Sequence, residues 1–523
     1  MKALSGKNEI DALLLVNNFV SNPVLTWQTT NTLGQPVNLD FGFLNTGANG
    51  VSSFVPMNSN LQSATRSVLS QFSEVANITF NETSPGSADI NFGTGALAVN
   101  GYSFTAGITY FGWNNSSDAS YSWLTGANVY LTTAGIAGYS TAAPGDEAYE
   151  TLVHEVGHAL GLGHPHDDIQ LSSTYDSNKY TVMSYNSYYS GASPAGLMLL
   201  DIQALQYLYG ANTSYKSGNT SINLKEFVQN GPRALWDGGG TDTLDMSSLS
   251  KGETLSLIEG KYSSIFAKDD FVIAYGAKIE NAKGTNFNDH IYGTATKNKL
   301  WGQNGNDSLV GYGGNDSLYG GSGDDTLKGG DGNDYVLVGG GKEYFDGGAG
   351  NDYISYFNSG GITLDLRANT VSGSWAGNDT IKSFESASGS GTGDDKIYGT
   401  DGANTIRTYG GNDKVYSRAG NDKIYAGDGN DRLEGGSGTD ALYGGAGADV
   451  FHFNKGDGND TIKDFQNNVD RIEFDNFSLA AGKDLMDYAK DVGDDIVFDM
   501  GGGNILTVEN AEMWMMGNDI FQV

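Results

Sequence analysis

The sequence predicts two structural classes in one chain, an α+β domain in residues 1–212 and then an all-β region of stacked parallel strands. Two observations predict this. Before residue 212, helical apolar spacing alternates with short strand-like runs. After it, Gly and Asp recur every nine residues, with an apolar residue at a fixed distance from each Asp, and such a period is typical of a solenoid.

Apolar spacing defines the elements of the α+β domain. We expect a helix from Leu61 that runs into a strand ending at Phe80, strands at 88–92 and 107–113, and helices at 147–160 and 198–209. Residues 8–18 also have a helical pattern. They either dock on this domain or belong to a short propeptide within residues 1–18.

The composition limits the possible partners. The chain has 76 Gly, 62 acidic residues against 29 basic ones, a formal net charge of −33 and no Cys. Such acidity disfavours binding to nucleic acid and to anionic membranes, and it attracts divalent cations. Without Cys the chain has no disulfides and no cysteine latch. We therefore expect no nucleic-acid partner.

One segment, H-E-V-G-H-A-L-G-L-G-H at residues 154–164, has the spacing of a metal site. His154 and His158 are four residues apart on the predicted helix, so both imidazoles lie on one face. Gly161 lets the chain reverse after the helix and bring His164 up as a third ligand. Three ligands leave a fourth position open, as in catalytic rather than structural zinc sites. We expect one catalytic zinc ion here.

Glu155 lies beside a ligand rather than on the ligand face, and we expect it to act as the general base for a zinc-activated water. A short H-E-x-x-H can also arise by chance on a buried amphipathic helix. The correctly spaced Gly161 and His164 argue against chance.

Here the sequence resembles the metzincin zinc peptidases, whose extended signature is followed by a Met-containing turn. The segment T-V-M-S-Y at 181–185 is similar to that turn. The resemblance implies that Met183 is a structural floor beneath the zinc, and that Tyr185 is a resting-state zinc ligand able to stabilise the oxyanion. Pro165 is typical of the serralysin subgroup. Two departures border the cleft: the stretch from His164 to Met183 is short, and Asn186 stands where serralysins usually have Trp.

The nine-residue repeat occupies two blocks in which each acidic position is followed two residues later by an apolar side chain. The first block has Asp289, Asp307, Asp316, Asp325, Asp334 and Asp352, with Asn298 and Glu343 in the two remaining registers, and apolar Ile291, Leu300, Leu309, Leu318, Leu327, Val336, Phe345 and Ile354. The second has Asp395, Asp413, Asp422, Asp431, Asp440 and Asp449, with Asn404 in register, and apolar Ile397, Ile406, Val415, Ile424, Leu433, Leu442 and Phe451.

This pattern resembles the RTX nonapeptide, which forms a parallel β-roll with calcium between its turns. The resemblance implies several structural calcium ions, held by the twelve Asp side chains of the two blocks. A flexible acidic linker is the alternative, but disorder does not require an apolar residue at a fixed offset from each Asp. We expect the roll to be largely unfolded in chelator and to fold with calcium. Neutral Asn298 and Asn404 should weaken their sites, and the site at Glu343 could be empty.

The repeat region also shows a larger duplication. Residues 236–294 resemble residues 345–400, so we expect two modules, 213–354 and 355–460, each a strand segment that leads into a roll. Alternating apolar runs in 461–523 predict an antiparallel β cap on the open end of the roll. With the two resemblances, the predicted fold class is an α+β metzincin catalytic domain followed by an all-β parallel β-roll with a duplicated module and an antiparallel β cap.

The ends of the chain predict export. The N-terminus matches neither a cleavable signal nor a membrane span. The last five residues, Asp519 to Val523, resemble the tail that type I secretion systems read. We expect a secreted, extracellular monomer whose partners are the secretion apparatus and a protein or peptide substrate.

These features predict a secreted calcium-dependent zinc endopeptidase of the serralysin type, with Glu155 as general base and Tyr185 assisting. The alternative is a calcium-dependent surface or adhesive RTX protein with an inactive peptidase domain. A third class, RTX lipases, needs a G-x-S-x-G elbow, and the sequence contains none.

Overall fold

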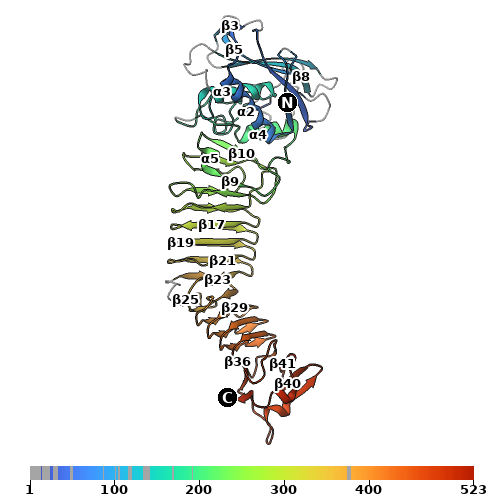
Figure 1. The fold of residues 1–523 in the computed structure, drawn as a ribbon, viewed down its shortest axis with the longest axis vertical. Coiled ribbons are helices and arrows are strands. Elements are labelled where there is room, and N and C mark those ends of the chain that lie inside the picture. Colours follow the sequence, from blue (N-terminus) through green and yellow to red (C-terminus); the bar gives the residue numbers. More distant parts are fainter. Residues whose placement is uncertain are drawn as a thin grey trace. The chain divides into compact units, whose positions relative to one another are not determined.

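The computed structural model describes residues 13–14, 24–27, 33–47, 51–85, 87–99, 102–103, 107–115, 121–132, 142–167, 170–190, 193–373 and 379–523. The chain divides into two compact units (Figure 1). The first comprises Met1–Asp245 and Ser256–Ile279, and the second Met246–Leu255 and Glu280–Val523.

The first unit contains a mixed sheet whose main path runs β1-β8-β5-β2-β4. β7 pairs antiparallel with β8, and among the described residues it has no other strand partner, so it is an edge strand. The strands are β1 (Val24–Thr26), β2 (Val37–Phe43), β3 (Val51–Val55), β4 (Ile78–Glu82), β5 (Ile90–Val99), β6 (Tyr102–Ser103), β7 (Gly107–Asn115) and β8 (Tyr121–Thr132).

Three helices pack with this sheet: α2 (Ser59–Val75), α3 (Glu147–Ala159) and α4 (Leu199–Tyr209). α2 buries an apolar stripe and begins at Asn58, whose side chain accepts a hydrogen bond from the Leu61 amide. α3 begins at Asp146 in the same way and contacts β7 and β8. The three helices expected from apolar spacing, one from Leu61 and the others at 147–160 and 198–209, are confirmed. Their ends differ from the expected ones by one or two residues where both are given.

The first unit continues beyond the α+β part. It adds α5 (Leu224–Val228), the parallel pair β9 (Ser221–Asn223) and β11 (Thr243–Asp245), and a small sheet in the order β10-β14-β13. The strands of that sheet are β10 (Arg233–Leu235), β14 (Phe271–Ile273) and β13 (Tyr262–Ser263).

The second unit is a parallel β-roll of two facing rows of short strands. One row is β15 (Asn281–Lys283), β17 (Lys299–Asn304), β19 (Ser317–Ser322), β21 (Tyr335–Leu337), β23 (Tyr353–Ser355), β27 (Ser386–Ser388), β29 (Thr405–Gly410), β32 (Lys423–Asp428), β35 (Ala441–Ala446) and β37 (Asn459–Ile462). The other is β12 (Thr254–Ser256), β16 (His290–Tyr292), β18 (Ser308–Gly313), β20 (Thr326–Asp331), β22 (Tyr344–Ala349), β26 (Thr380–Lys382), β25 (Thr370–Gly373), β24 (Ile362–Asp365), β28 (Lys396–Tyr398), β30 (Lys414–Tyr416), β33 (Arg432–Glu434), β36 (Val450–Asn454), β38 (Arg471–Asp475) and β42 (Ile520–Gln522).

Consecutive strands of one row are offset by eighteen residues through most of the repeats, as in Leu300 beside Leu318 and Leu309 beside Leu327. Successive nonapeptides therefore alternate between the rows. The apolar residue that follows each acidic position is buried at every register of both blocks. The core of the roll is thus a double column of apolar side chains, as the repeat pattern predicts.

Two features interrupt the regular roll. Between the blocks, β24 and β25 form an antiparallel hairpin, and β25 then pairs with β26. After the last repeats, β39 (Ala489–Val492), β40 (Asp495–Gly501) and β41 (Asn504–Val508) form an antiparallel meander joined to β37. The remaining short elements are β31 (Ala419–Gly420), β34 (Ser437–Gly438), η1 (Leu485–Tyr488) and η2 (Met513–Met515).

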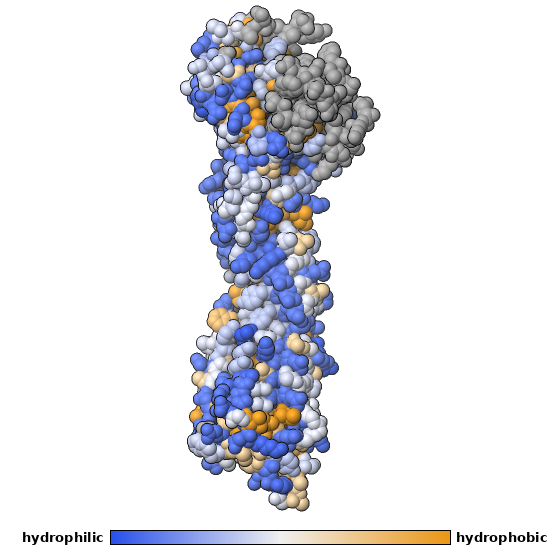
Figure 2. All heavy atoms as spheres, turned by 90° about the vertical axis from the view of Figure 1, so that its right-hand side faces the viewer, coloured by the Kyte–Doolittle hydropathy of each residue, from blue (hydrophilic) through white to orange (hydrophobic). Residues whose placement is uncertain are grey.

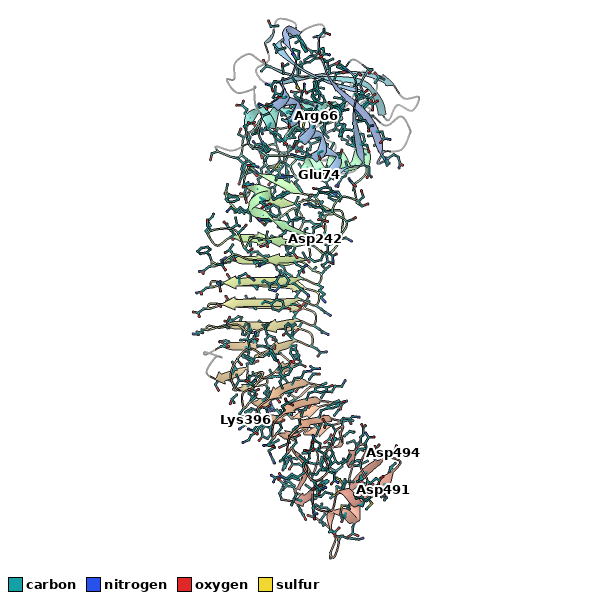
Figure 3. The ribbon with its side chains drawn as sticks, in the orientation of Figure 1. Arg66, Glu74, Asp242, Lys396, Asp491 and Asp494 are labelled. Atoms are coloured by element: carbon teal, nitrogen blue, oxygen red, sulfur yellow. The ribbon has the colours of Figure 1, made fainter. Side chains whose placement is uncertain are left out.

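The surface seen in Figure 2 is mostly hydrophilic, with small and separate apolar patches. Charged side chains line both units, as Figure 3 shows for Arg66, which pairs with Glu82, and for Lys396, which lies over the ring of Tyr398. Among the described residues, no helix has the length and apolarity needed to cross a membrane.

Most of the helix expected at residues 8–18 lies outside the described residues. Leu13 and Leu14 are described, and both are buried. Leu14 forms a β-bridge with Leu162, and the Leu13 carbonyl accepts a hydrogen bond from the Gly163 amide. The N-terminal segment therefore contacts the chain between α3 and His164.

Candidate functional site

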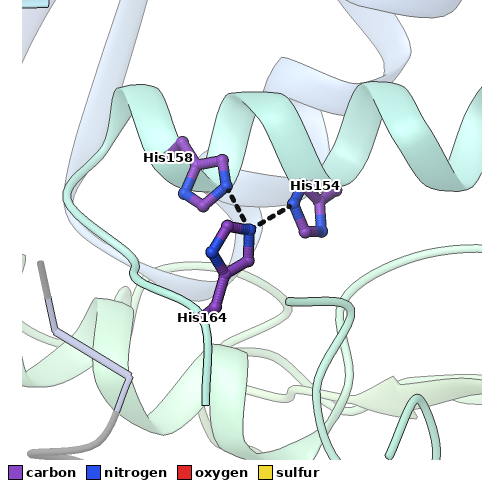
Figure 4. A group of neighbouring side chains, drawn as sticks. All are labelled: His154, His158 and His164. Atoms are coloured by element: carbon purple, nitrogen blue, oxygen red, sulfur yellow. Dashed lines mark hydrogen bonds between the residues drawn. The ribbon is translucent and has the colours of Figure 1, made fainter. Parts of the chain in front are cut away.

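The three histidines of the 154–164 segment converge (Figure 4). His154 and His158 project from one face of α3. The chain then reverses at Gly161, whose φ of +95° is in the left-handed region that glycine tolerates. The Nε2 atom of His164 lies 3.2 Å from Nε2 of His154 and 3.0 Å from Nε2 of His158.

The opposite nitrogen of each ring is already occupied. His154 Nδ1 donates to the Val182 carbonyl and His158 Nδ1 to the Leu162 carbonyl, each over 2.8 Å. His164 Nδ1 lies 3.0 Å from the Asp167 carboxylate. Because carbonyl and carboxylate oxygens only accept, each Nδ1 carries the proton and each Nε2 presents a lone pair.

Three lone pairs that face one another have no proton to share, so this arrangement fits a cation. Two nitrogens bound tetrahedrally to zinc at about 2.0–2.1 Å lie roughly 3.3 Å apart, close to the separations seen here. Burial also keeps the rings neutral, since it lowers the pKa of His154 to about 4 and lowers the pKa values of His158 and His164. The donor set therefore fits a zinc ion.

Glu155 is buried beside the cluster, and burial raises the pKa of its carboxyl to about 7. The Thr109 hydroxyl on β7 lies 2.8 Å from Glu155 Oε2 and 2.9 Å from its backbone oxygen. β7 passes so close that a Cβ atom at Gly107 would lie 2.7 Å from Glu155 Cγ. Only glycine at position 107 leaves room for the carboxylate.

The 181–185 turn lies against the histidines. The Met183 side chain is fully buried, and its Sδ would lie 2.8 Å from a Cβ placed at Gly157, which directly precedes His158 on α3. The Tyr185 hydroxyl lies 2.7 Å from His164 Nε2, although the Tyr185 residue is 67% exposed. Burial of this hydroxyl and the nearby charges of Glu155 and Asp167 raise the pKa of Tyr185 to about 12.

Asp201, at the start of α4, supports this turn. Its fully buried carboxylate accepts hydrogen bonds from the Thr181 hydroxyl at 2.5 Å, the Val182 amide at 2.9 Å and the Met198 amide at 3.0 Å. It therefore fixes the residue whose carbonyl orients His154. No sequence pattern pointed to Asp201 or Thr109, because each acts on a residue far away in the chain.

A cleft of about 510 Å³ opens at the cluster. The described residues that line it include the carboxylates Glu147, Glu150 and Glu155, and no Lys or Arg. The first two lie on α3 at helical spacing from His154, so one helix face carries both the carboxylates and the metal-binding rings.

In the roll, the acidic positions form two hydrogen-bonded ladders. Within the blocks, most of these residues donate their backbone amide to a carboxylate eighteen residues later, as from Asp289 to Asp307 and from Asp307 to Asp325, both over 2.8 Å. The second carboxylate oxygen is buried without a hydrogen-bond partner at nearly all of the predicted calcium ligands: Asp307, Asp316, Asp325, Asp334, Asp352, Asp413, Asp422, Asp431, Asp440 and Asp449. Unpaired buried carboxylate oxygens are costly, and oxygen donors of this kind fit calcium.

The first Asp of each block differs. Asp289 accepts the Glu253 amide at Oδ1 and the Thr285 amide at Oδ2, over 2.7 and 2.6 Å. Asp395 likewise uses both oxygens, for the Ile362 and Ser390 amides. These two carboxylates are already satisfied within the protein.

The three irregular registers fall into two kinds. Asn298 and Asn404 each donate through Nδ2 to a backbone carbonyl, of Glu280 and Glu385 respectively, and accept through Oδ1. Glu343 instead behaves like an Asp: Oε2 accepts the Asp325 amide over 3.1 Å, and buried Oε1 has no hydrogen-bond partner.

Comparison with known proteins agrees with this geometry. Residues 57–207 match the family model described as metallopeptidase family M12B, reprolysin-like. Residues 283–318, 319–354, 390–424, 418–451 and 425–462 match the RTX calcium-binding nonapeptide repeat. The chain therefore carries a reprolysin-like metallopeptidase domain and RTX calcium-binding repeats.

The related sequences are serralysins. Serralysin B of Dickeya chrysanthemi is 31% identical over 333 residues, which cover 55% of this chain and 65% of that protein. Serralysin C of the same organism is 33% identical over 303 residues, covering 51% and 60%. Serralysin of Proteus mirabilis is 31% identical over 315 residues, covering 53% and 63%. The chain thus spans less than two thirds of these relatives.

Among solved structures, the extracellular lipase LipA from Serratia marcescens aligns with 45% of this chain and 40% of that chain, at 20% sequence identity and a TM-score of 0.22. A similarity this low carries no conclusion about the present chain.

Proposed function

We propose that this protein is a secreted, calcium-dependent zinc endopeptidase of the serralysin type. One observation carries the proposal: the Nε2 atoms of His154 and His158 each lie within 3.2 Å of His164 Nε2, at a cleft that also holds the buried carboxylate of Glu155. His154, His158 and His164 would hold the ion. Tyr185 would be a further ligand at rest, supported by the closeness of its hydroxyl to His164.

A bound zinc ion supplies a Lewis acid and lowers the pKa of water to about 7. The chain's own groups do the rest. Glu155 takes the proton of the attacking water and later passes it to the leaving amine. Thr109 holds the carboxylate in place for both transfers. The Tyr185 hydroxyl, protonated at neutral pH, can donate a hydrogen bond to the developing oxyanion.

The substrate is an extended peptide that pairs with the free edge of β7, the strand that also carries Thr109 and Gly107. The acidic lining of the cleft favours peptides with a basic side chain next to the scissile bond. Glu150 is the residue we assign to this preference, because it lies one helical turn before His154.

Calcium binds at the Asp ladders, with Asp289 and Asp395 the weakest of the twelve proposed ligands. We further propose that residues 213–354 and 355–460 are duplicated modules. Support comes from the matched environments of Asp289 and Asp395 and of Asn298 and Asn404. The β39–β41 meander within 461–523 would cap the roll, and residues 1–212 would form the catalytic domain. We also propose that the protein is exported through a type I secretion apparatus and that it is a monomer.

Casein hydrolysis by the full chain, loaded with zinc and calcium, tests the function. Glu155→Gln should lower activity at least about a hundredfold, with zinc content unchanged. Glu82→Gln is the matched control, because Glu82 pairs with Arg66 on the surface of the same domain. A zinc-loaded wild type without activity would instead favour a calcium-dependent surface or adhesive protein.

A further inference from the structure

We propose that Asp269 is a positioning residue of the active site, because it fixes the segment that presents Tyr185 to the histidines. This inference rests on the proposed function. Asp269 lies between β13 and β14, outside residues 57–207 that match the peptidase family. The proposal therefore gives a role in the peptidase site to a residue of the first module, 213–354.

The segment in question is residues 178–189, which includes the 181–185 turn. Its Val182 carbonyl orients the ring of His154, and its Tyr185 hydroxyl reaches His164. Tyr185 is largely exposed, and its ring contacts those of His154 and His164. The position of its hydroxyl also depends on how firmly the backbone on either side is held.

Asp269 contacts this segment both before and after the turn. Its Oδ2 atom lies 2.8 Å from Lys179 Nζ and accepts a hydrogen bond from the Tyr188 hydroxyl over 2.6 Å. Its backbone carbonyl accepts the Tyr189 hydroxyl over 2.7 Å. One residue thus joins both ends of the segment that carries Tyr185.

The ion pair is shielded from solvent. The side chains of Lys179 and Asp269 are only 13% and 21% exposed. Lys179 Nζ lies 4.4 Å from the ring centroid of Tyr262 and 4.8 Å from that of Tyr188, and Tyr262 donates a hydrogen bond to the Lys179 carbonyl. A shielded pair with cation–π contacts holds its geometry better than an exposed one.

The loop that carries Asp269 is itself constrained. Asp269 has a φ of +58°, which costs free energy for a residue with a Cβ. Its amide donates to the Ser264 hydroxyl over 3.0 Å. The next residue, Asp270, accepts the amides of Ile265, Phe266 and Ala267. A rigid loop with an unfavourable backbone at the contacting residue is the arrangement expected of a positioning element.

The test compares Asp269→Ala and Asp269→Asn in the full, metal-loaded chain. Asp269→Ala should lower kcat at least tenfold and leave zinc content unchanged. It should also speed amide hydrogen exchange in residues 178–190. Asp269→Asn keeps an acceptor for Tyr188 and should recover part of kcat. The matched control is Asp401→Ala, which removes an ion pair with Arg367 whose two side chains are each 59% exposed, and it should change neither kcat nor exchange.

The proposal would be overturned if Asp269→Ala had the same kcat and the same amide exchange in residues 178–190 as the wild type. If that variant does not fold, Asp269→Asn decides, because wild-type values in both measurements would overturn it as well. A wild-type protein without peptidase activity would refute the proposed function instead. The exchange of residues 178–190 would then still report whether Asp269 fixes the Tyr185 segment.

Discussion

The Thr109 hydroxyl lies 2.8 Å from the Glu155 carboxylate, so an edge strand of the sheet holds the residue that we propose as general base. The same strand is where we propose that the substrate pairs. Binding of a peptide to β7 would therefore act on the strand that orients the carboxylate, and it would couple substrate binding to the position of the base.

Thr109→Val should lower kcat without loss of zinc. The change removes a hydrogen bond to a buried carboxylate, and such bonds contribute about 1.5–3 kcal/mol, which corresponds to a decrease of roughly tenfold to a hundredfold. Steady-state kinetics with a peptide substrate measures it. Thr79→Val on β4, at an exposed position, should keep the wild-type kcat, and an equal loss in both variants would contradict the role of Thr109.

Glu150→Gln should weaken a preference for basic substrates. Glu150 lines the cleft and accepts a hydrogen bond from Asn178 Nδ2 over 3.2 Å, a contact that glutamine can keep through its carbonyl oxygen. A charge pair near a protein surface contributes about 1–4 kcal/mol, so the ratio of kcat/KM for Lys over Leu peptides should fall several-fold or more. Profiling with a peptide library measures this ratio, which Glu82→Gln should leave intact. An unbiased wild-type profile would refute the preference.

The metal-free roll should gain structure as the pH falls. Burial raises the pKa to about 7 at Asp307, Asp316, Asp422 and Asp431. These pKa values lie above the pKa of about 3.9 that Asp has in an unfolded chain. The stability that the four carboxyl groups contribute is therefore fully present below about pH 3.9, and it is lost as the pH rises through about 7.

Circular dichroism in chelator should therefore show more β structure at pH 5 than at pH 8. With calcium bound the order should reverse, because protons compete with the ion for the carboxylates. Full β structure in chelator at pH 8 would contradict the prediction that calcium drives folding.

Asn404→Asp should create an additional calcium requirement. In the wild type, the Asn404 amide donates to the Glu385 carbonyl. Aspartate would place a second acceptor opposite that oxygen, at a cost of about 1–3 kcal/mol unless a cation bridges them. Equilibrium dialysis should detect one more bound calcium ion, and thermal unfolding at low calcium should show a loss of stability. Unchanged stoichiometry and stability would argue against a cation site at this register.

The repetitive and local features of the molecule could be predicted from the sequence. The columns of Leu300, Leu309 and their equivalents follow from the nine-residue period, and the approach of His154 to His158 follows from helical spacing. Gly161 marked the reversal that brings in His164. In each case the partner lies close in the chain or at a fixed repeat distance, so periodicity is enough to place it.

The supports of the site could not be predicted in this way. Thr109, Asp201 and Asp269 act on residues that the fold brings near across long separations in sequence, and none belongs to a motif. The ladders show the same limit. They continue beyond the repeats through Asp379, Glu385, Asp460 and Asp470, which accept amides as the nonapeptide carboxylates do. No fixed spacing reveals these residues.

The eighteen-residue step of the ladders means that the roll changes length in units of two nonapeptides. Removing eighteen residues would leave every later strand in its own row, with each Asp amide still facing a carboxylate. Removing nine would turn everything downstream by half a revolution about the roll axis and exchange its two sides. Asp289 and Asp395 are 106 residues apart, which is not a multiple of nine. The nine-residue register is therefore interrupted between the two blocks, and the hairpin of β24 and β25 lies at this interruption.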